Sequence, residues 1–171
     1  YMIKAIVAVD KKWGIGKNNG LLFSLPEDMK FFRTATTGKT VVMGYKTLLS
    51  FPGGKPLKNR VNIVLCPEDT QPEGCVVVHN LDELFAEIDK YDEVYVIGGA
   101  MTYHTLLPYC DEALITKVEA DGNAAVFFDN LDNCDNWSCV NESHPLETNG
   151  YEIKFTKYVN SDVKKYKPEQ K

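Results

Sequence analysis

Short apolar runs alternate with segments of helical spacing along most of the chain. The apolar runs are rich in β-branched residues and predict strands at residues 3–9, 40–44, 60–66, 75–79, 93–97 and 113–118. Helices are predicted between them at residues 25–33, ending near Gly38, and at residues 45–50, 81–88 and 100–107. This alternation is typical of a mainly parallel sheet that is covered on both faces and joined by right-handed crossovers.

The last part of the chain has a different pattern. Strands are predicted at residues 137–141 and 151–158, which flank the turn sequence Asn149-Gly150 with no helix between them. We therefore predict an α/β fold of three layers, with a mainly parallel central sheet flanked by helices and an antiparallel C-terminal strand pair. One domain is expected over residues 1–159, followed by a polar, frayed tail at residues 160–171.

Composition narrows the class of protein. The chain has 171 residues, of which 44% are hydrophobic, enough for one core without disulfides or a structural metal. The net charge of −5, with basic residues scattered among acidic ones, argues against a nucleic-acid partner. Five cysteines without a C-x-x-C pair indicate reduced thiols, and the histidines lack zinc-ligand spacing. The apolar run at residues 6–9 is too short for a membrane span, so we expect a cytoplasmic protein.

Three glycine-containing segments invite comparison with phosphate-binding loops. Gly38-Lys39-Thr40 lacks the earlier glycine of a Walker motif, so we interpret it as a helix stop. Gly14-Ile15-Gly16 lacks the third glycine of a dinucleotide motif and no helix follows directly, so residues 14–20 are predicted to be a mobile loop. Gly98-Gly99 lies between a strand and a helix, where its amides can face an anion; a plain tight turn explains it equally well.

Two charged residues are candidates for ligand contacts. Asp28 lies one helical turn from Phe32, so an acid and an aromatic ring share one face. From helix position alone, the alternative that Asp28 merely favours the helix N-terminus, as Glu27 does, is the better interpretation. Arg60 is one of two arginines and opens an apolar strand, where it can form a bidentate pair with a ligand carboxylate; a surface ion pair is the alternative.

Read in chain order, a series of short segments resembles the motifs of dihydrofolate reductases. Their order and spacing make the resemblance specific, and it covers residues 2–158. The matching segments are Ala8-Val9-Asp10, Ile15-Gly16-Lys17-Asn18-Asn19, Leu25-Pro26-Glu27-Asp28, Val42-Met43-Gly44 with Thr47, Arg60 with Asn62-Ile63-Val64-Leu65, Ile97-Gly98-Gly99 with Tyr103, and residues 114–118.

The resemblance implies the fold of that family, hydride transfer from NADPH to C6 of 7,8-dihydrofolate, and protonation of N5. Asp28 would be the catalytic acid, supported by Thr116, and Arg60 would bind the glutamate α-carboxylate. The substrate would contact Ile6, Val7, Asp28, Met29, Phe32, Phe51, Leu57, Arg60, Ile97, Tyr103 and Thr116. NADPH would contact Ala8, Ile15, Gly16, Asn19, Gly20, Gly44, Tyr45, Lys46, Thr47, Leu65, Cys66, His79, Ile97, Gly98, Gly99, Ala100, Met101 and Tyr103. Residues 14–23 would form a lid, antifolates would inhibit, and we expect a monomer that binds no membrane.

The chain also departs from the family pattern. Phe23 and Leu22 stand where the family usually has tryptophan and proline. Ala125 stands where an acid would hydrogen-bond the lid, so we expect a more mobile lid. Tyr45 replaces a frequent arginine, and Cys66-Pro67-Glu68 offers poor donors to a 2′-phosphate. We therefore expect a reduced preference for NADPH over NADH that depends on Lys46.

Two other functions are compatible with parts of the sequence. A related nicotinamide-dependent reductase of another pterin or of a pyrimidine would keep Gly98-Gly99 without needing Arg60. A non-catalytic folate-binding protein would keep Arg60 and Phe32 but would tolerate the loss of Asp28. The presence of Asp28 favours the enzyme.

Overall fold

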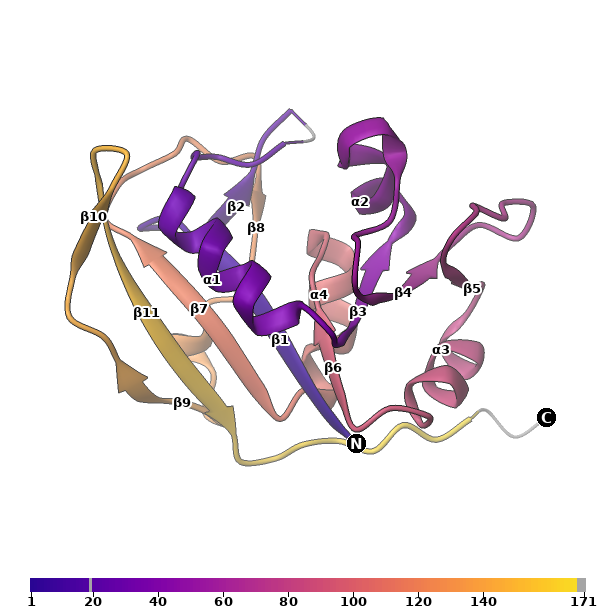
Figure 1. The fold of residues 1–171 in the computed structure, drawn as a ribbon. Coiled ribbons are helices and arrows are strands. Elements are labelled where there is room, and N and C mark those ends of the chain that lie inside the picture. Colours follow the sequence, from indigo (N-terminus) through magenta and orange to yellow (C-terminus); the bar gives the residue numbers. More distant parts are fainter. Residues whose placement is uncertain (19, 169–171) are drawn as a thin grey trace.

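The computed structural model describes residues 1–18 and 20–168. Within them, one sheet contains the strands β1 (Met2–Val9), β3 (Thr40–Gly44), β4 (Val61–Leu65), β5 (Val76–Val78), β6 (Glu93–Val96), β7 (Glu112–Val118), β9 (Trp137–Glu142), β10 (Leu146–Thr148) and β11 (Tyr151–Asn160). Their order is β10-β11-β7-β1-β6-β3-β4-β5, and β9 also pairs with β11 (Figure 1).

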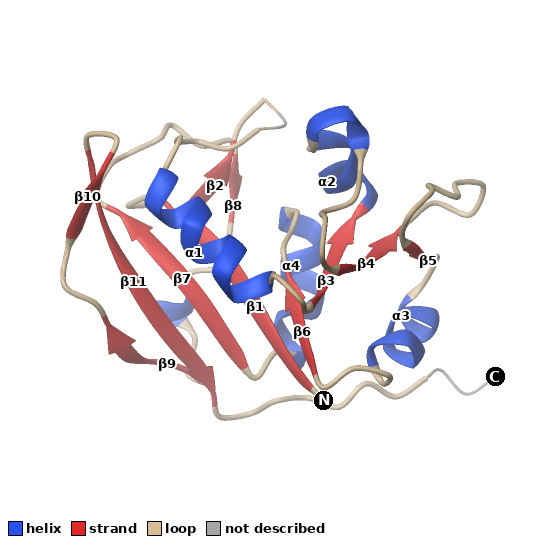
Figure 2. Ribbon diagram, in the orientation of Figure 1, coloured by secondary structure: helices blue, strands red, loops and turns tan. Residues whose placement is uncertain are grey.

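Helices cover both faces of this sheet, as predicted. They are α1 (Pro26–Thr36), α2 (Tyr45–Ser50), α3 (Leu81–Ile88) and α4 (Ala100–Leu106) (Figure 2). The alternating side chains of β3 show how the sheet separates two cores. Val41 and Met43 pack with the apolar side chains of α1 and α2, whereas Val42 packs on the other face with those of α3 and α4. The three-layer prediction is therefore confirmed.

The strand directions also agree with the prediction, with one correction at the C-terminus. β1 is parallel to β6 and β7, and β3 is parallel to β4 and β6. The antiparallel part is larger than a strand pair, because β11 pairs with β7, β9 and β10. Asn149 and Gly150, with φ of 50° and 82°, join β10 to β11 in a tight hairpin.

The prediction that residues 14–20 form only a loop is wrong. β2 (Gly14–Gly16) pairs antiparallel with β8 (Val126–Phe127), and Lys17 and Gly20 form an isolated bridge. A strand of three residues is too short to show periodicity. Its partner lies more than a hundred residues away, so nothing local in the sequence indicates the pairing.

The C-terminal tail packs on the domain, so the expected fraying is wrong for the described residues up to 168. The Lys164 N–H donates to the Pro108 carbonyl at 2.9 Å. The Tyr166 ring stacks on Phe85 with centroids 4.4 Å apart, and its hydroxyl hydrogen-bonds Asp82. One aromatic side chain thus anchors a segment that is otherwise polar.

None of the helices in the described part of the chain combines the length and the apolar character needed to cross a membrane.

Candidate active site

The predicted acid Asp28 faces the sheet from α1, which crosses in front of β7 and β1 (Figure 1). Thr116 on β7 is buried, and its Oγ1 donates to Asp28 Oδ1 at 2.6 Å. Burial raises the pKa of Asp28 above its ordinary value, and the bond from Thr116 opposes this shift. Among the described residues, this is the one donor to the carboxylate, which has about four lone-pair positions. The side chain is therefore held in place with most of its acceptor capacity left for a ligand.

Apolar side chains from several elements surround the space beside Asp28. Ile6 on β1 belongs to one cluster with Phe32 of α1, Phe51 at the end of α2, Leu57 and Ile97. These are all predicted substrate residues, and the fold brings them together. An acid within such a cluster matches a flat ring system that has a few polar edge atoms.

Tyr103 of α4 reaches the same space from the other face of the sheet. Its hydroxyl donates to the Ile6 carbonyl at 2.7 Å. Burial, and then the negative charge of Asp28, raise the pKa of Tyr103, so the phenol stays protonated and remains a donor. The carbonyl of Ile6, a predicted substrate residue, therefore already has one protein partner.

Arg60 lies just before β4, beside the C-terminal end of α1. Its Nε donates to Thr36 Oγ1 at 2.9 Å, Nη2 to Thr37 Oγ1 at 3.3 Å, and Nη1 to the Lys58 carbonyl at 3.2 Å. The guanidinium also lies over the Phe32 ring, 5.8 Å from its centroid. Burial and the neighbouring Arg33 lower the pKa of Arg60. Three of five N–H donors orient the group, which leaves two for a carboxylate.

Two helix N-termini meet at one edge of the sheet. β3 leads into α2 through Gly44, and β6 leads through Gly98 and Gly99 into α4, while the Gly44 N–H donates to the Gly98 carbonyl at 2.9 Å. Neither helix has a side-chain cap, whereas the Asn80 side chain caps α3. Uncapped N–H groups at adjacent helix starts are suited to binding phosphate oxygens.

The glycines at this edge let side chains of α4 pack closely against the backbone. A Cβ at Gly44 would lie 2.8 Å from Thr102 Oγ1, and a Cβ at Gly98 would lie 3.4 Å from Tyr103 Cε2. Gly98 also has a φ of 125°, which other residues rarely adopt, and its peptide bond to Gly99 is cis. The cradle therefore requires glycine at both positions.

His79, predicted to contact the cofactor, holds a turn in place. Its Nδ1 lies 3.1 Å from the carbonyl oxygens of Cys66 and of Pro67, and its Nε2 lies 2.9 Å from Gln71 Nε2. Carbonyl oxygens accept and amide nitrogens donate, so this geometry requires the tautomer with the proton on Nδ1. Both ring nitrogens thus have protein partners.

The remaining predicted residues occupy several elements. Predicted substrate residues also come from β1 (Val7) and the exposed side of α1 (Met29). Predicted cofactor residues also come from β1 (Ala8), β2 (Ile15, Gly16), the bridge after it (Gly20), the start of α2 (Tyr45, Lys46, Thr47), the end of β4 (Leu65, Cys66) and the start of α4 (Ala100, Met101). Asn19 lies outside the described residues. Met29 and Met101 are largely exposed, at 55% and 77%.

Sequence reasoning missed three residues that shape the site. Thr36 and Thr37 orient Arg60 through their hydroxyls, and Asp10 binds the backbone of the lid. Asp10 carried a weak signal, because an acid that ends an apolar strand shortly before a glycine is typical of a turn.

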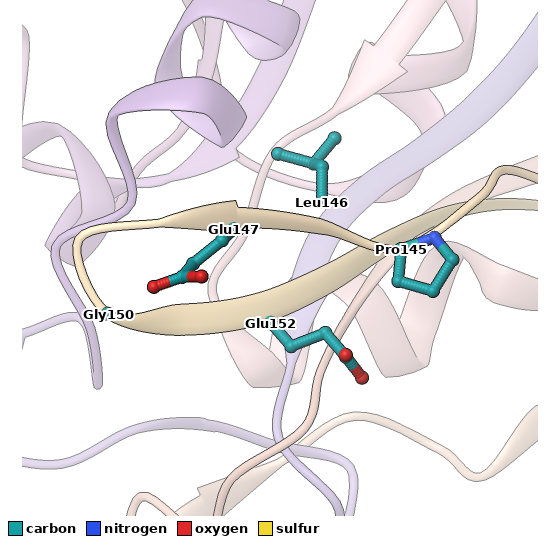
Figure 3. Close-up of a pocket in the computed structure, with 5 residues that line it drawn as sticks. All are labelled: Pro145, Leu146, Glu147, Gly150 and Glu152. Carbon is teal, nitrogen blue, oxygen red and sulfur yellow. The ribbon is translucent and has the colours of Figure 1, made fainter.

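A surface hollow lies apart from these residues. It lies on the β10–β11 hairpin and is lined by Pro145, Leu146, Glu147, Gly150 and Glu152 (Figure 3). Its volume is about 430 Å³. None of these is a predicted site residue, and the hollow offers carboxylates where the substrate would need cations.

Comparison with known proteins gives one consistent result. The family model of dihydrofolate reductase matches residues 2–160. The dihydrofolate reductase of Bacillus subtilis is 35% identical over 167 residues, which cover 96% of this chain and 98% of that protein. That of Haemophilus influenzae is 33% identical over 152 residues, which cover 88% and 93%. The solved structure of dihydrofolate reductase from Enterococcus faecalis, complexed with NADP(H) and RAB-propyl, is 34% identical with a TM-score of 0.85, covering 94% of this chain and 97% of that one.

Proposed function

The chain belongs to the dihydrofolate reductase family, and on that premise we propose how its own residues carry out the NADPH-dependent reduction of 7,8-dihydrofolate to 5,6,7,8-tetrahydrofolate. The observation that carries the proposal is the Asp28–Thr116 pair, a partly buried carboxylate with open acceptor positions on the same helix as Phe32, which belongs to an apolar cluster.

Asp28 is the group that binds and organises the proton. Its carboxylate accepts hydrogen bonds from N3 and the exocyclic amino group of the pterin, and the Thr116 hydroxyl fixes its orientation. The raised pKa keeps the carboxyl protonated to higher pH than in water, so Oδ2, which receives no bond from Thr116, can hold a proton. Asp28 thereby organises the proton that N5 receives, while Phe32 packs on the ring.

Arg60 fixes the opposite end of the substrate. The two N–H donors that the protein leaves open point to a bidentate pair with the glutamate α-carboxylate. Phe51 and Leu57 lie in the same apolar cluster as Phe32 and would line the channel between the two ends.

The cofactor cradle fits NADPH. The uncapped starts of α2 and α4 suit the pyrophosphate, because their backbone N–H groups are free of side-chain caps and lie beside the glycines Gly44 and Gly98. Lys46 on the first turn of α2 is the cation for the 2′-phosphate. When bound, NADPH supplies the hydride. Ala8, Ile15 and Gly16 shape the nicotinamide side, and the lid excludes water there.

We also propose that residues 1–159 form a single reductase domain that works as a cytoplasmic monomer. The five cysteines are free thiols, which supports a reducing compartment.

The decisive experiment measures the loss of reduced-nicotinamide absorbance after dihydrofolate is added, with methotrexate as the blocking control. We expect NADPH oxidation that requires the substrate and that methotrexate stops. A non-catalytic folate-binding protein would show no oxidation. A reductase of another pterin or of a pyrimidine would show equal turnover with a substrate that lacks the glutamate tail.

A further inference from the structure

A second acid, Asp10, lies at the end of β1 and is not one of the predicted substrate or cofactor residues. It is only 4% exposed. Its Oδ1 accepts hydrogen bonds from the N–H groups of Lys12 at 2.8 Å and Gly14 at 2.7 Å, and its Oδ2 accepts from the Gly122 N–H at 3.0 Å. One carboxylate thus joins the start of the lid to the segment 119–125, which connects β7 to β8.

Close packing accompanies these bonds at both ends of the lid. A Cβ at Gly14 would lie 2.3 Å from the Cβ of Ala124, and a Cβ at Gly122 would lie 2.8 Å from Leu22 Cδ1 and 3.0 Å from Phe23 Cζ. The segment 119–125 therefore touches the lid where it begins and where it ends. Displacement of this segment would displace the lid with it.

Other links between the two segments are weaker or involve the backbone. The Ala125 N–H donates to the Gly16 carbonyl at 2.9 Å, as part of the β2–β8 pairing. Lys11 and Lys12 form ion pairs with Glu119 and Asp121, but these side chains are exposed and such pairs contribute little. Among the described residues, Asp10 is the buried side chain that hydrogen-bonds both segments.

We propose that Asp10 is the positioning residue that sets the lid over the nicotinamide side of the site, which rests on the function proposed above. Asp10 lies in the chain between Ala8 and Ile15, both expected to contact the cofactor, and it fixes Gly14 directly before Ile15. It acts through the backbone of the lid and touches neither substrate nor cofactor. The methyl side chain of Ala125 cannot hydrogen-bond the lid, so the chain relies on Asp10 for a side-chain hydrogen bond to it.

The test uses Asp10→Asn, which separates the two halves of the link. The asparagine oxygen can still accept from Lys12 and Gly14, but its NH₂ group would face the Gly122 N–H, so that bond is lost. We expect the single-turnover rate of hydride transfer to fall by about 10- to 100-fold, as for a misplaced reacting group. The KM for dihydrofolate should change by less than about twofold, because Asp28 and Arg60 are unchanged.

Asp121→Asn is the matched control, because Asp121 lies in the same segment but is exposed. It should leave the hydride step unchanged. Gly14→Ala is a second variant, which displaces the lid by crowding, because a Cβ at Gly14 would lie 2.3 Å from the Ala124 Cβ and 2.9 Å from both carboxylate oxygens of Asp10. It should also lower kcat more than it changes KM. Asp10→Asn with a lower unfolding temperature but a normal hydride step would overturn the proposal.

Amide hydrogen exchange in the unaltered protein tests the link without a variant. The Gly14 and Gly122 amides should be protected and should slow together when NADPH binds. Independent exchange of the two amides would overturn the proposal. Substrate-dependent NADPH oxidation by the unaltered enzyme is measured first, so failure of the proposed function is distinguished from failure of this inference.

Discussion

The surroundings of Asp28 and Asp10 show how the same functional group serves two purposes. Asp28 receives one hydrogen bond, from a side-chain hydroxyl, and burial raises its pKa. Asp10 receives three, all from backbone N–H groups. The first carboxylate keeps most of its acceptor positions for a ligand. The acceptor positions of the second are occupied by backbone N–H groups, so it organises loops without taking part in chemistry.

Asp28→Asn should have the largest effect. The amide cannot take or give the proton as a carboxyl does, so hydride transfer to dihydrofolate should slow by ~10²–10⁴-fold, while NADPH binding is kept. Stopped-flow measurement of the hydride step, with fluorescence titration of NADPH, checks both expectations. Glu27→Gln, at the exposed neighbouring position, should change neither. Normal turnover of Asp28→Asn at neutral pH would remove the assigned role.

Arg60 is both oriented by the protein and open to a ligand, because protein acceptors bind three of its N–H groups and two N–H groups remain for a carboxylate. Arg60→Ala should weaken dihydrofolate binding by about 2–4 kcal/mol, the usual loss for a partly desolvated charge pair. A pteridine without the glutamate tail should bind as before. Arg33→Ala is the control, since Arg33 is exposed on the same helix. Calorimetric titration of both ligands measures the difference; equal losses would place the carboxylate elsewhere.

The two carboxylates should also have opposite effects on stability. Asp10→Asn should lower the free energy of unfolding by about 1–3 kcal/mol, because it leaves a buried N–H without its acceptor. For Asp28 the folded-state pKa lies above the unfolded value of 3.8, so stability decreases as pH rises through that interval and the ionised form is unfavourable at neutral pH. Asp28→Asn should therefore raise the free energy of unfolding at pH 7. Urea unfolding of both variants measures the change in the free energy of unfolding. Changes of the same sign would contradict the difference between the two carboxylates.

The smallest expected effect is a shift in pH dependence. The hydride step should slow as pH rises through the pKa of Asp28, because the protonated form is lost. Thr116→Val removes the bond that lowers this pKa, so the midpoint should move to higher pH. Thr156→Val is the matched control, since that hydroxyl donates to the Ile115 carbonyl at 2.6 Å, away from Asp28. If the unaltered enzyme, Thr116→Val and Thr156→Val had the same midpoint, Asp28 would not be the group whose titration controls the hydride step.

The layers and most elements could be predicted because each long element carries its own pattern. The contacts across the sheet have no local pattern, and the pairing of Asp28 with Thr116 was predicted only through the resemblance to the family. Asp28 by position looks like a helix N-terminal acid, and its partner Thr116 is 88 residues away on β7. That pairing depends on the strand order, which only the packing of the whole sheet decides. The short β2 and the docking of Tyr166 were missed for the same reason, because a distant partner stabilises each of them.

The outer edge of the antiparallel region has a consequence for solution behaviour. β9 and β10 lie along β11 one after the other, interrupted near Pro145, and β9 has a bulge at Val140, where its register against Lys157 and Tyr158 of β11 shifts. A neighbouring molecule would therefore meet two short, offset ladders in place of one continuous row of free N–H and C=O groups. Proline, bulges and short edge strands are the features that keep sheets from joining edge to edge. This rim should resist fibril formation when the protein is concentrated.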